Sequence, residues 1–142
     1  MNKKIIFSIL TLLSFNAFSS EWFSEFRCFT SDSKKTINVK MVNIHSEKDN
    51  ARLSYVKYEK SPIYIPILLV KNESEILSEG RPYMSTTIWH EMIQGKVNGA
   101  YTIISQGARV YGFTYISKKG KQVDFEENVE AYDAEKKDCI WK

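Results

Sequence analysis

The side chains that most often carry out chemistry in proteins are few and widely spaced in this sequence. It holds two histidines, His45 and His90, and two cysteines, Cys28 and Cys139. The segment that begins at His90 resembles half of a zinc-protease motif, but Gln94 stands where the second histidine would be needed. Two histidines and a cysteine pair expected to form a disulfide leave no zinc-ligand set, so we expect no metal site.

Catalytic nucleophile and phosphate-binding motifs are also missing. The sequence contains no Gly-x-Ser-x-Gly nucleophile elbow and no glycine-rich phosphate loop. Asp124 and Glu126 lie two residues apart in a strand-like run and so share one face, whereas a glycosidase needs two carboxylates about 5–9 Å apart across a cleft. The sequence therefore predicts no catalytic residue, no cofactor and no enzymatic activity.

Basic and aromatic side chains, the usual anchors of protein–protein contacts, are more plentiful. Tyr111, Phe113 and Tyr115 alternate along one run, so we expect their rings on a single face. Either both faces of this strand are covered by other parts of the fold, or the tyrosine face is exposed for binding another protein. The second interpretation predicts a basic-aromatic partner-binding surface, although each residue taken alone also fits an ordinary surface position. Its members are Arg81, Tyr83, Arg109, Tyr111, Lys118, Lys119 and Lys121.

The two cysteines are expected to pair with each other. Cys28 and Cys139 lie near the two ends of the chain, and no Cys-x-x-Cys redox motif is present. An even number of cysteines in an oxidising compartment usually forms structural disulfides. We therefore predict a disulfide that ties the first strand to the C-terminus, where closing a loop of about 100 residues contributes up to about 4.7 kcal/mol.

The N-terminus indicates export from the cytoplasm. Lys3 and Lys4 precede an apolar run at 5–15, which is followed by small residues at 16–20. This order is typical of a secretory signal peptide, and the run is shorter than the ~20 apolar residues that a membrane-spanning helix needs. We expect cleavage after Ser19, which leaves residues 20–142 as a single domain in the periplasm without membrane insertion.

Loss of the signal peptide changes the charge of the protein. The formal net charge falls from +3 to +1 because Lys3 and Lys4 are removed. A nucleic-acid-binding protein should carry a concentrated basic face, whereas the charges of this sequence are interspersed. We therefore expect no nucleic-acid partner.

Apolar residues mostly recur with a period of two, which is typical of β-strands. Turn residues such as Gln106-Gly107 and Asn98-Gly99 separate short runs at about ten-residue intervals in the second half. This pattern predicts a mainly β fold, an antiparallel barrel or sandwich of about eight strands with a short helical or irregular C-terminal segment. The expected strands span residues 22–30, 35–43, 52–58, 63–70, 83–93, 101–105, 109–117 and 121–126.

Three segments need separate predictions. The run 63–70 is apolar on both faces, as a central strand would be, but Pro66 within it predicts an edge position or a bulge. Residues 72–80 are polar and are expected to form a loop with one helical turn. Residues 126–137 are expected to form a short helix or an extended segment that leads to Cys139.

The whole chain resembles periplasmic bacteriocin immunity proteins of the pesticin type. The likeness comes from the signal-like residues 1–20, the start Glu21-Trp22-Phe23, the two framing cysteines, the total length and the closing residues 138–142. A weaker resemblance, through Cys28, residues 37–39, residues 99–102 and the closing cysteine, is to periplasmic C-type lysozyme inhibitors. Those proteins are small β-barrels with an end-to-end disulfide.

Both resemblances imply the same kind of partner, a protein toxin or lysozyme-like hydrolase that cleaves the glycan strands of peptidoglycan. The implied mechanism is occlusion, in which a rigid loop with Arg, Lys or Tyr side chains blocks the acidic cleft of the muramidase. The alternatives are a β-barrel that holds a small apolar ligand or helps to assemble the envelope, with Tyr55, Tyr64 and Tyr111 lining a cavity, and an enzyme with a non-standard site.

Overall fold

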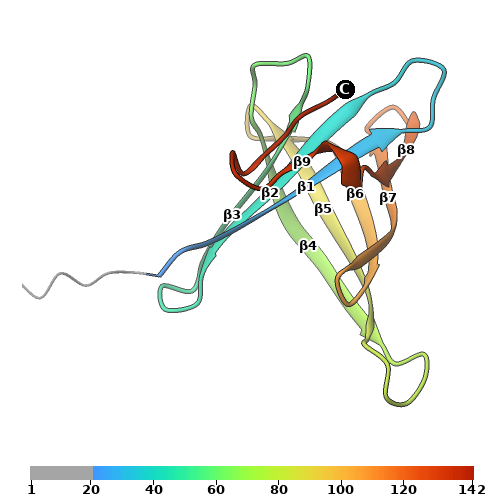
Figure 1. Ribbon diagram of the computed structural model, residues 1–142. Helices are drawn as coiled ribbons and strands as arrows, with labels where there is room; N and C mark the ends of the chain where they lie inside the picture. The colour runs from blue at the N-terminus through green and yellow to red at the C-terminus, as the bar shows by residue number, and fades with distance from the viewer. Residues whose placement is uncertain (1–20) are drawn as a thin grey trace, which may run out of the picture.

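Eight antiparallel strands form a closed barrel in the computed structural model, which describes residues 21–142 (Figure 1). Each strand pairs with its neighbour in sequence, and β1 pairs with β8. The predicted fold class is therefore confirmed, with a barrel rather than a sandwich, whereas the predicted signal peptide lies outside the described residues. The strands are β1 (Phe23–Ser31), β2 (Asn38–Ser46), β3 (Ala51–Tyr58), β4 (Ile65–Glu75), β5 (Met84–Ile93), β6 (Lys96–Gln106), β7 (Arg109–Ser117) and β8 (Gln122–Glu127).

Aromatic and β-branched side chains fill the interior of the barrel. They come from alternate positions of each strand because successive side chains of a strand point to opposite faces. Phe113 lies among three other rings, with centroid distances of 4.2 Å to Phe29, 5.4 Å to Tyr101 and 5.3 Å to Phe125. The buried core consists of Phe29, Val39, Met41, Val56, Ile67, Trp89, Tyr101, Ile103, Phe113 and Phe125.

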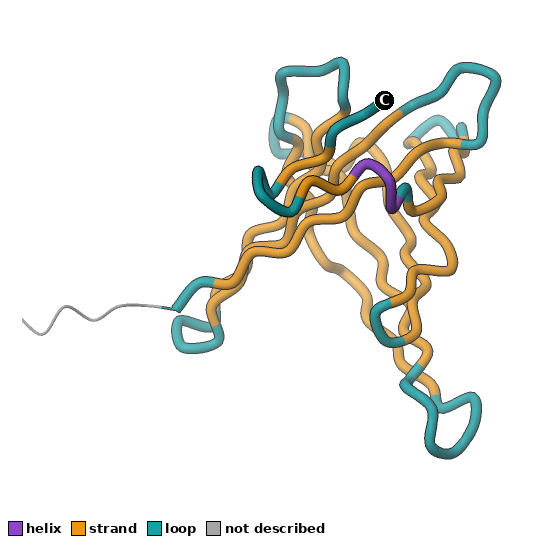
Figure 2. The backbone as a smooth tube through the Cα atoms, viewed as in Figure 1, coloured by secondary structure: helices purple, strands orange, loops and turns teal. Residues whose placement is uncertain are grey.

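The barrel is closed at one end only. Two residue pairs join β3 to β4, and three join β1 to β8. Beyond these short ladders the strands diverge into two arms, one made of β1–β3 and the other of β4–β8 (Figure 2). We call the closed end, drawn at the top of Figures 1 and 2, the upper end, and the divergent end the lower end.

Pro66 lies in the shorter of these two ladders, where it pairs with Tyr55. Proline has no N–H group to donate, so it is tolerated where few ladder hydrogen bonds are needed. Strand β4 pairs with both β3 and β5, so the predicted edge position is wrong, and the bulge that was its alternative lies further along the strand, between Leu69 and Lys71. The prediction of a central strand covered on both faces is wrong, because Leu68 and Val70 are about half exposed beside the divergent arms.

A C-terminal strap, residues 128–142, crosses the outer face of the β1–β2 sheet. It contains the 3₁₀ turn η1 (Val129–Ala131) and the short strands β9 (Tyr132–Asp133) and β10 (Asp138–Cys139). The predicted disulfide joins Cys28 of β1 to Cys139. The Tyr132 ring packs on Phe26 at a centroid distance of 5.4 Å, and Lys40 Nζ lies 2.7 Å from a carboxylate oxygen of Asp138. The segment 126–137 therefore contains the end of β8, one 3₁₀ turn in place of a helix, the short strand β9 and a turn at 134–137.

Two turns differ from their predicted positions. Residues 72–75, the first part of the loop predicted at 72–80, extend β4 because β5 continues to pair with them as far as Met84. Asn98 and Gly99 lie inside β6, and the turn before it is formed by Gln94 and Gly95. Both turn residues have positive φ, 51° and 74°, a conformation that tight turns use and glycine adopts readily.

A bulge in β7 separates the tyrosines that alternation placed on one face. Ile104 pairs with Gly112 and Ser105 with Val110, so Tyr111 is the extra residue between them. A bulge redirects the side chains that follow it. Phe113 is buried and Tyr115 half-buried inside the barrel, whereas Tyr111 is 53% exposed. The prediction of a shared tyrosine face is therefore wrong.

Removal of the disulfide tests the role of the strap. Replacing both Cys28 and Cys139 by serine should lower the free energy of unfolding by up to about 4.7 kcal/mol, because the bond closes a very long loop. Urea unfolding followed by tryptophan fluorescence measures the change. Wild-type protein in a thiol reductant should unfold at the same urea concentration as the double variant, and an unchanged midpoint would contradict a stabilising disulfide.

A buried serine provides a second test of the packing. The hydroxyl of Ser54 is inside the barrel wall without a hydrogen-bond partner, an arrangement that costs about 1–3 kcal/mol. Ser54→Ala should therefore leave the free energy of unfolding unchanged or raise it by about 1 kcal/mol. The control is Ser46→Ala, which should lower it because the Ser46 hydroxyl both donates to and accepts from Asp49. Equal losses in the two variants would contradict this account.

Candidate partner-binding surfaces

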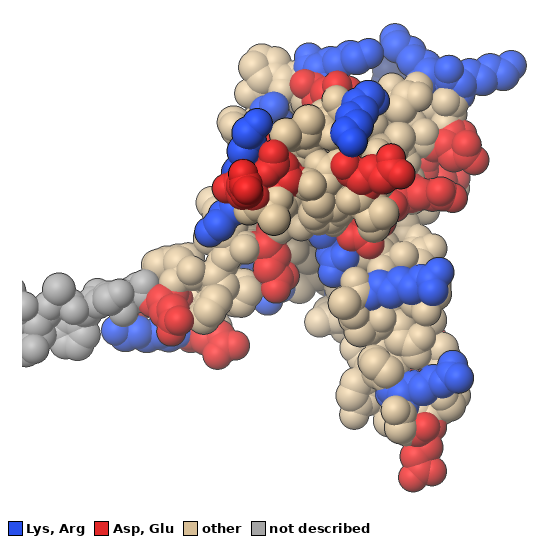
Figure 3. Space-filling view, in the orientation of Figure 1, with Lys and Arg blue, Asp and Glu red and all other residues tan. Residues whose placement is uncertain are grey.

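Lysines in or directly beside four separate turns gather at the upper end of the barrel. In an up-and-down barrel every second turn lies at the same end, which here brings together the turns β1–β2, β3–β4, β5–β6 and β7–β8. Figure 3 shows blue Lys and Arg side chains along this upper edge. We call the set the lysine crown: Lys34, Lys35, Lys60, Lys96, Lys118, Lys119 and Lys121, all of them exposed.

The charge of the lysine crown is not neutralised by the protein itself. The same four turns contain two acidic residues, Asp32 and Glu59, and Glu59 accepts a hydrogen bond from Asn38. Within residues 21–142, ion pairs form between Arg27 and Glu127, Lys40 and Asp138, Lys71 and Glu73, and Lys136 and Asp133, and none of these involves a crown lysine. The ammonium groups are therefore available to carboxylates or phosphates of another molecule.

Arg81, Tyr83, Arg109 and Tyr111 lie at the lower end of the barrel. The guanidinium of Arg109 stacks on the Tyr111 ring, with its carbon 4.8 Å from the ring centroid. The β4–β5 loop that carries Arg81 and Tyr83 contacts the neighbouring turn through a 2.9 Å hydrogen bond from Gln106 Nε2 to the carbonyl oxygen of Pro82. We call these four residues the arginine–tyrosine end.

The seven residues of the predicted basic-aromatic surface are thus not brought together. Strand β7 runs the length of the barrel, so Arg109 at its start and Lys118 just after its end lie at opposite ends. Lys118, Lys119 and Lys121 belong to the lysine crown, and the other four residues form the arginine–tyrosine end. Sequence reasoning missed Lys34, Lys35, Lys60 and Lys96, because only the barrel topology brings these distant residues beside Lys118.

A groove of about 450 Å³ lies beside the arginine–tyrosine end, between β7 and the end of β8. The ladder between β7 and β8 stops at the pair Phe113–Phe125, so residues 109–112 of β7 are not paired with β8. Arg109, Tyr111 and Glu126 line this groove together with Val129 of the strap. The charges of the groove are mixed, in contrast to the basic upper end.

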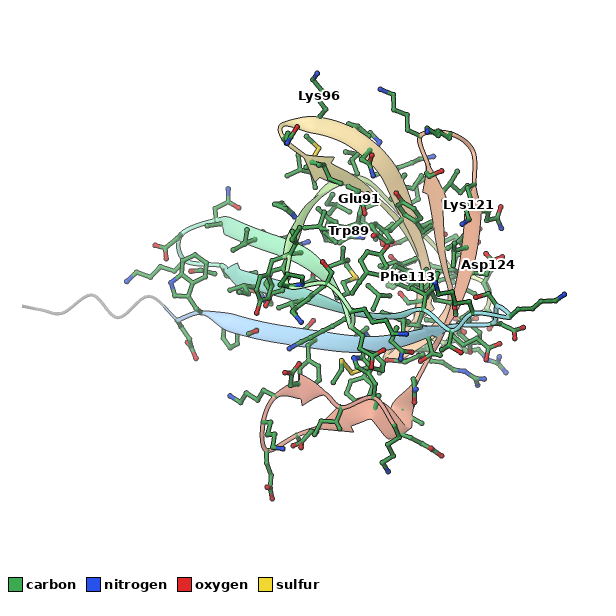
Figure 4. All side chains as sticks on the ribbon, turned by 90° about the horizontal axis from the view of Figure 1, so that it is seen from above. Trp89, Glu91, Lys96, Phe113, Lys121 and Asp124 are labelled. Atoms are coloured by element: carbon green, nitrogen blue, oxygen red, sulfur yellow. A yellow bond between two sulfur atoms is a disulfide. The ribbon has the colours of Figure 1, made fainter. Side chains whose placement is uncertain are left out.

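A buried carboxylate lies beneath the lysine crown, where Figure 4 looks onto the upper end. Glu91 of β5 is 2% exposed and accepts hydrogen bonds from Asn98 Nδ2 at 2.6 Å, the Tyr101 hydroxyl at 2.7 Å and the Tyr115 hydroxyl at 2.9 Å. The Tyr58 hydroxyl lies 2.6 Å from that of Tyr101. We call these residues the Glu91 cluster.

Burial keeps the tyrosines of this cluster protonated. It raises the pKa of Tyr58 to about 12 and also raises the pKa values of Tyr101 and Tyr115, which the Glu91 carboxylate raises further. Protonated hydroxyls can donate to Glu91, so the buried charge is stabilised by hydrogen bonds rather than by an ion pair. Glu91 is held inside the barrel away from solvent. Its hydrogen bonds connect β5 to β6 and β7 at the upper end of the barrel.

Two local features of β6 make the Glu91 cluster possible. Asn98 is the extra residue of a bulge between β5 and β6, which lets its side chain reach Glu91. Gly99 next to it leaves room for Tyr115, whose ring atoms would lie 2.5 Å from a Cβ at that position. The sequence contained a signal for this buried acid. Glu91 lies two residues after Trp89 in the same strand, so period-two alternation places both side chains on the inner face of the barrel.

His45 and the tyrosines considered for a ligand cavity have defined neighbours. His45 stacks on Phe23 with ring centroids 5.5 Å apart, and residues 21–142 contain no group of three side chains able to hold a metal ion. Tyr55 and Tyr64 contact each other in an edge-to-face arrangement on the outer wall, and Tyr111 is also outside. The cavity that these three tyrosines would line in a small-ligand-binding barrel is therefore not formed.

Comparisons with known proteins add no family to this description. No protein family, no curated protein and no solved structure matches the chain. Across the described part of the chain, no helix is long and apolar enough to cross a membrane.

A pair of glycine variants tests the Glu91 cluster. Gly99→Ala should lower the free energy of unfolding by at least about 2 kcal/mol, because the new Cβ displaces Tyr115 and leaves a buried carboxylate with fewer donors. Gly112→Ala is the matched control, since a Cβ there meets Ile104 at an ordinary 3.8 Å. Urea unfolding measures both, and equal stabilities of the two variants would argue against the tight contact at Gly99.

Proposed function

We propose that this protein belongs to the class of exported, disulfide-stabilised binding proteins that act by holding a charged surface ready for another protein. Within that class, we propose a periplasmic immunity protein that neutralises a peptidoglycan-cleaving muramidase of the pesticin type. The resemblance of the whole sequence to such immunity proteins supports the choice of partner, and the disulfide is compatible with an oxidising compartment.

The observation that carries this proposal is the lysine crown. Seven exposed lysines without intramolecular ion pairs surround one end of the barrel. A muramidase cleft depends on acidic side chains, a general acid and a second carboxylate. Opposite potentials on the two surfaces accelerate the encounter and orient the complex.

The rest of the fold supports occlusion as the mechanism. The crown turns are short, and each joins two paired strands above the hydrogen-bonded Glu91 cluster. The turn β7–β8 is itself ordered by hydrogen bonds, including those from Ser117 N to the Lys121 carbonyl oxygen and from Lys118 N to the Asn98 carbonyl oxygen. Turns that are already ordered lose little conformational entropy on binding, which favours a tight complex.

The decisive experiment compares two double variants with the same change in charge. Residues 20–142 are purified in the oxidised form, and binding to a pesticin-type muramidase is measured by calorimetry at two salt concentrations. Lys118→Glu with Lys119→Glu should weaken binding at least about tenfold, because it places like charges against an acidic cleft. Turbidity of a cell-wall suspension should show a matching loss of inhibition.

The control carries Arg81→Glu and Arg109→Glu at the lower end of the barrel. We expect its affinity to stay close to that of the wild-type protein. A loss confined to this control would assign the partner to the arginine–tyrosine end, and a wild-type protein that neither binds nor inhibits any muramidase would refute the proposed function.

A further inference from the structure

In the middle of strands β5, β6 and β7, between Lys96 at the start of β6 and Arg109 at the start of β7, the outer face carries no Asp, Glu, Lys or Arg. Its members alternate with buried residues such as Trp89, Tyr101 and Phe113, so they must point away from the barrel interior. We call this surface the neutral face: Thr86, Ile88, His90, Ala100, Thr102, Ile104, Gly112, Thr114 and Ile116.

The pairing of the strands arranges the neutral face in three rows. One row contains Ile88, Thr102 and Thr114, which face one another across β5, β6 and β7. The row above it contains His90, Ala100 and Ile116, and the row below contains Thr86, Ile104 and Gly112. These nine residues form one continuous surface, with Thr102 at its centre.

Charged residues border the neutral face on both sides. Lys71 of β4 pairs with Ile88, and Asp124 of β8 pairs with Thr114 and accepts a hydrogen bond from its hydroxyl at 2.8 Å. A charge-depleted centre with polar and charged residues around it is the usual composition of a protein–protein interface. Ile104 and Ile116 on this face remain 37% and 44% exposed.

The C-terminal strap covers a different wall of the barrel. In Figure 4 the strap lies on the far side of β1 from β5 and β6. Phe26 and Val42, on the outer face of the β1–β2 sheet, line the groove beneath the strap together with Tyr132. The neutral face therefore remains available to a second molecule in the part of the chain that the structure describes.

The neutral face is continuous with the lysine crown. Ile116 lies two residues before Lys118, whose backbone N–H donates to the Asn98 carbonyl oxygen of β6 at 2.8 Å. Lys96 of the crown begins the same strand, β6, that carries Ala100 and Thr102. A molecule that binds the upper lysines from the side of β6 and β7 thus also meets the neutral face.

We propose that the neutral face forms the uncharged centre of the partner interface, and that the lysine crown forms its basic border. This inference rests on the proposed function and assigns the muramidase as the occupant. The outer wall of a barrel is convex, so its complement is a concave surface, and the crown requires that surface to be acidic at one edge. A glycan-binding cleft is concave and contains catalytic carboxylates, so it offers both the shape and the charge that this surface needs.

Arginine substitutions test the neutral face. Ile116→Arg and Thr102→Arg each place an unpaired charge in a region that the complex would desolvate, and we expect each to weaken binding to the muramidase at least about tenfold. Leu53→Arg is the matched control, since Leu53 is a 54% exposed aliphatic residue on β3 of the other arm. Circular dichroism checks the fold of each variant, and Ile116→Arg alone decides the test if the substitution at the central Thr102 prevents folding.

Each outcome has a defined meaning. Weaker binding of the two neutral-face variants, with Leu53→Arg unchanged, supports the inference. Wild-type affinity in all three variants overturns it while the proposed function stands. A wild-type dimer in analytical ultracentrifugation that Thr102→Arg dissociates, with muramidase binding unaltered, overturns it in favour of a second copy of this chain. A wild-type protein that binds no muramidase removes both proposals.

Discussion

Closure of the barrel depends on very few backbone contacts. The β1–β8 ladder begins at Phe29, and the residue before it, Cys28, carries the disulfide to the strap. The backbone of Cys28 also accepts a hydrogen bond from Asn128 N and donates one to the Tyr132 hydroxyl. A covalent bond, two hydrogen bonds and the short ladder therefore meet at one point of β1. Together with the β3–β4 ladder, this junction closes the sheet at the upper end and so brings the upper turns into one ring.

The two ends of the barrel consequently differ in rigidity and in surface chemistry. At the upper end, the Glu91 cluster connects β3, β5, β6 and β7 through side-chain hydrogen bonds inside the wall. At the lower end, Arg27 bridges the open seam by contacting Glu127 at 2.8 Å and the Ala108 carbonyl oxygen at 3.2 Å. The predominantly positive charge lies at the hydrogen-bonded upper end, and the mixed charges of the arginine–tyrosine end lie where the strands diverge. This distribution supports the proposal that the partner binds at the upper end.

Most of the architecture could be predicted from the sequence, because period-two alternation and turn residues are local signals. The eight predicted strands overlap the eight strands of the barrel, and the cysteine pair could be predicted from number and position. The errors arise where a bulge interrupts the alternation. Tyr111 is the extra residue of one bulge and points outward, and Asn98 is the extra residue of the other and points toward Glu91. Neither bulge has a local sequence signal that distinguishes it from a regular strand. The lysine crown could not be predicted at all without topology, since its members are spread from residue 34 to residue 121.

The up-and-down topology has a consequence for how such a surface can diversify. Four short hairpin connections and the first residue of β6 supply the crown lysines, and the chain passes through the whole barrel between one connection and the next. If the crown binds the partner as proposed, an insertion or exchange in any one connection would alter recognition without changing the register of the strands that lead to it. The scaffold thus allows a new specificity to be acquired in four separate, additive steps, in the way that hypervariable loops are remodelled on an unchanged antibody framework.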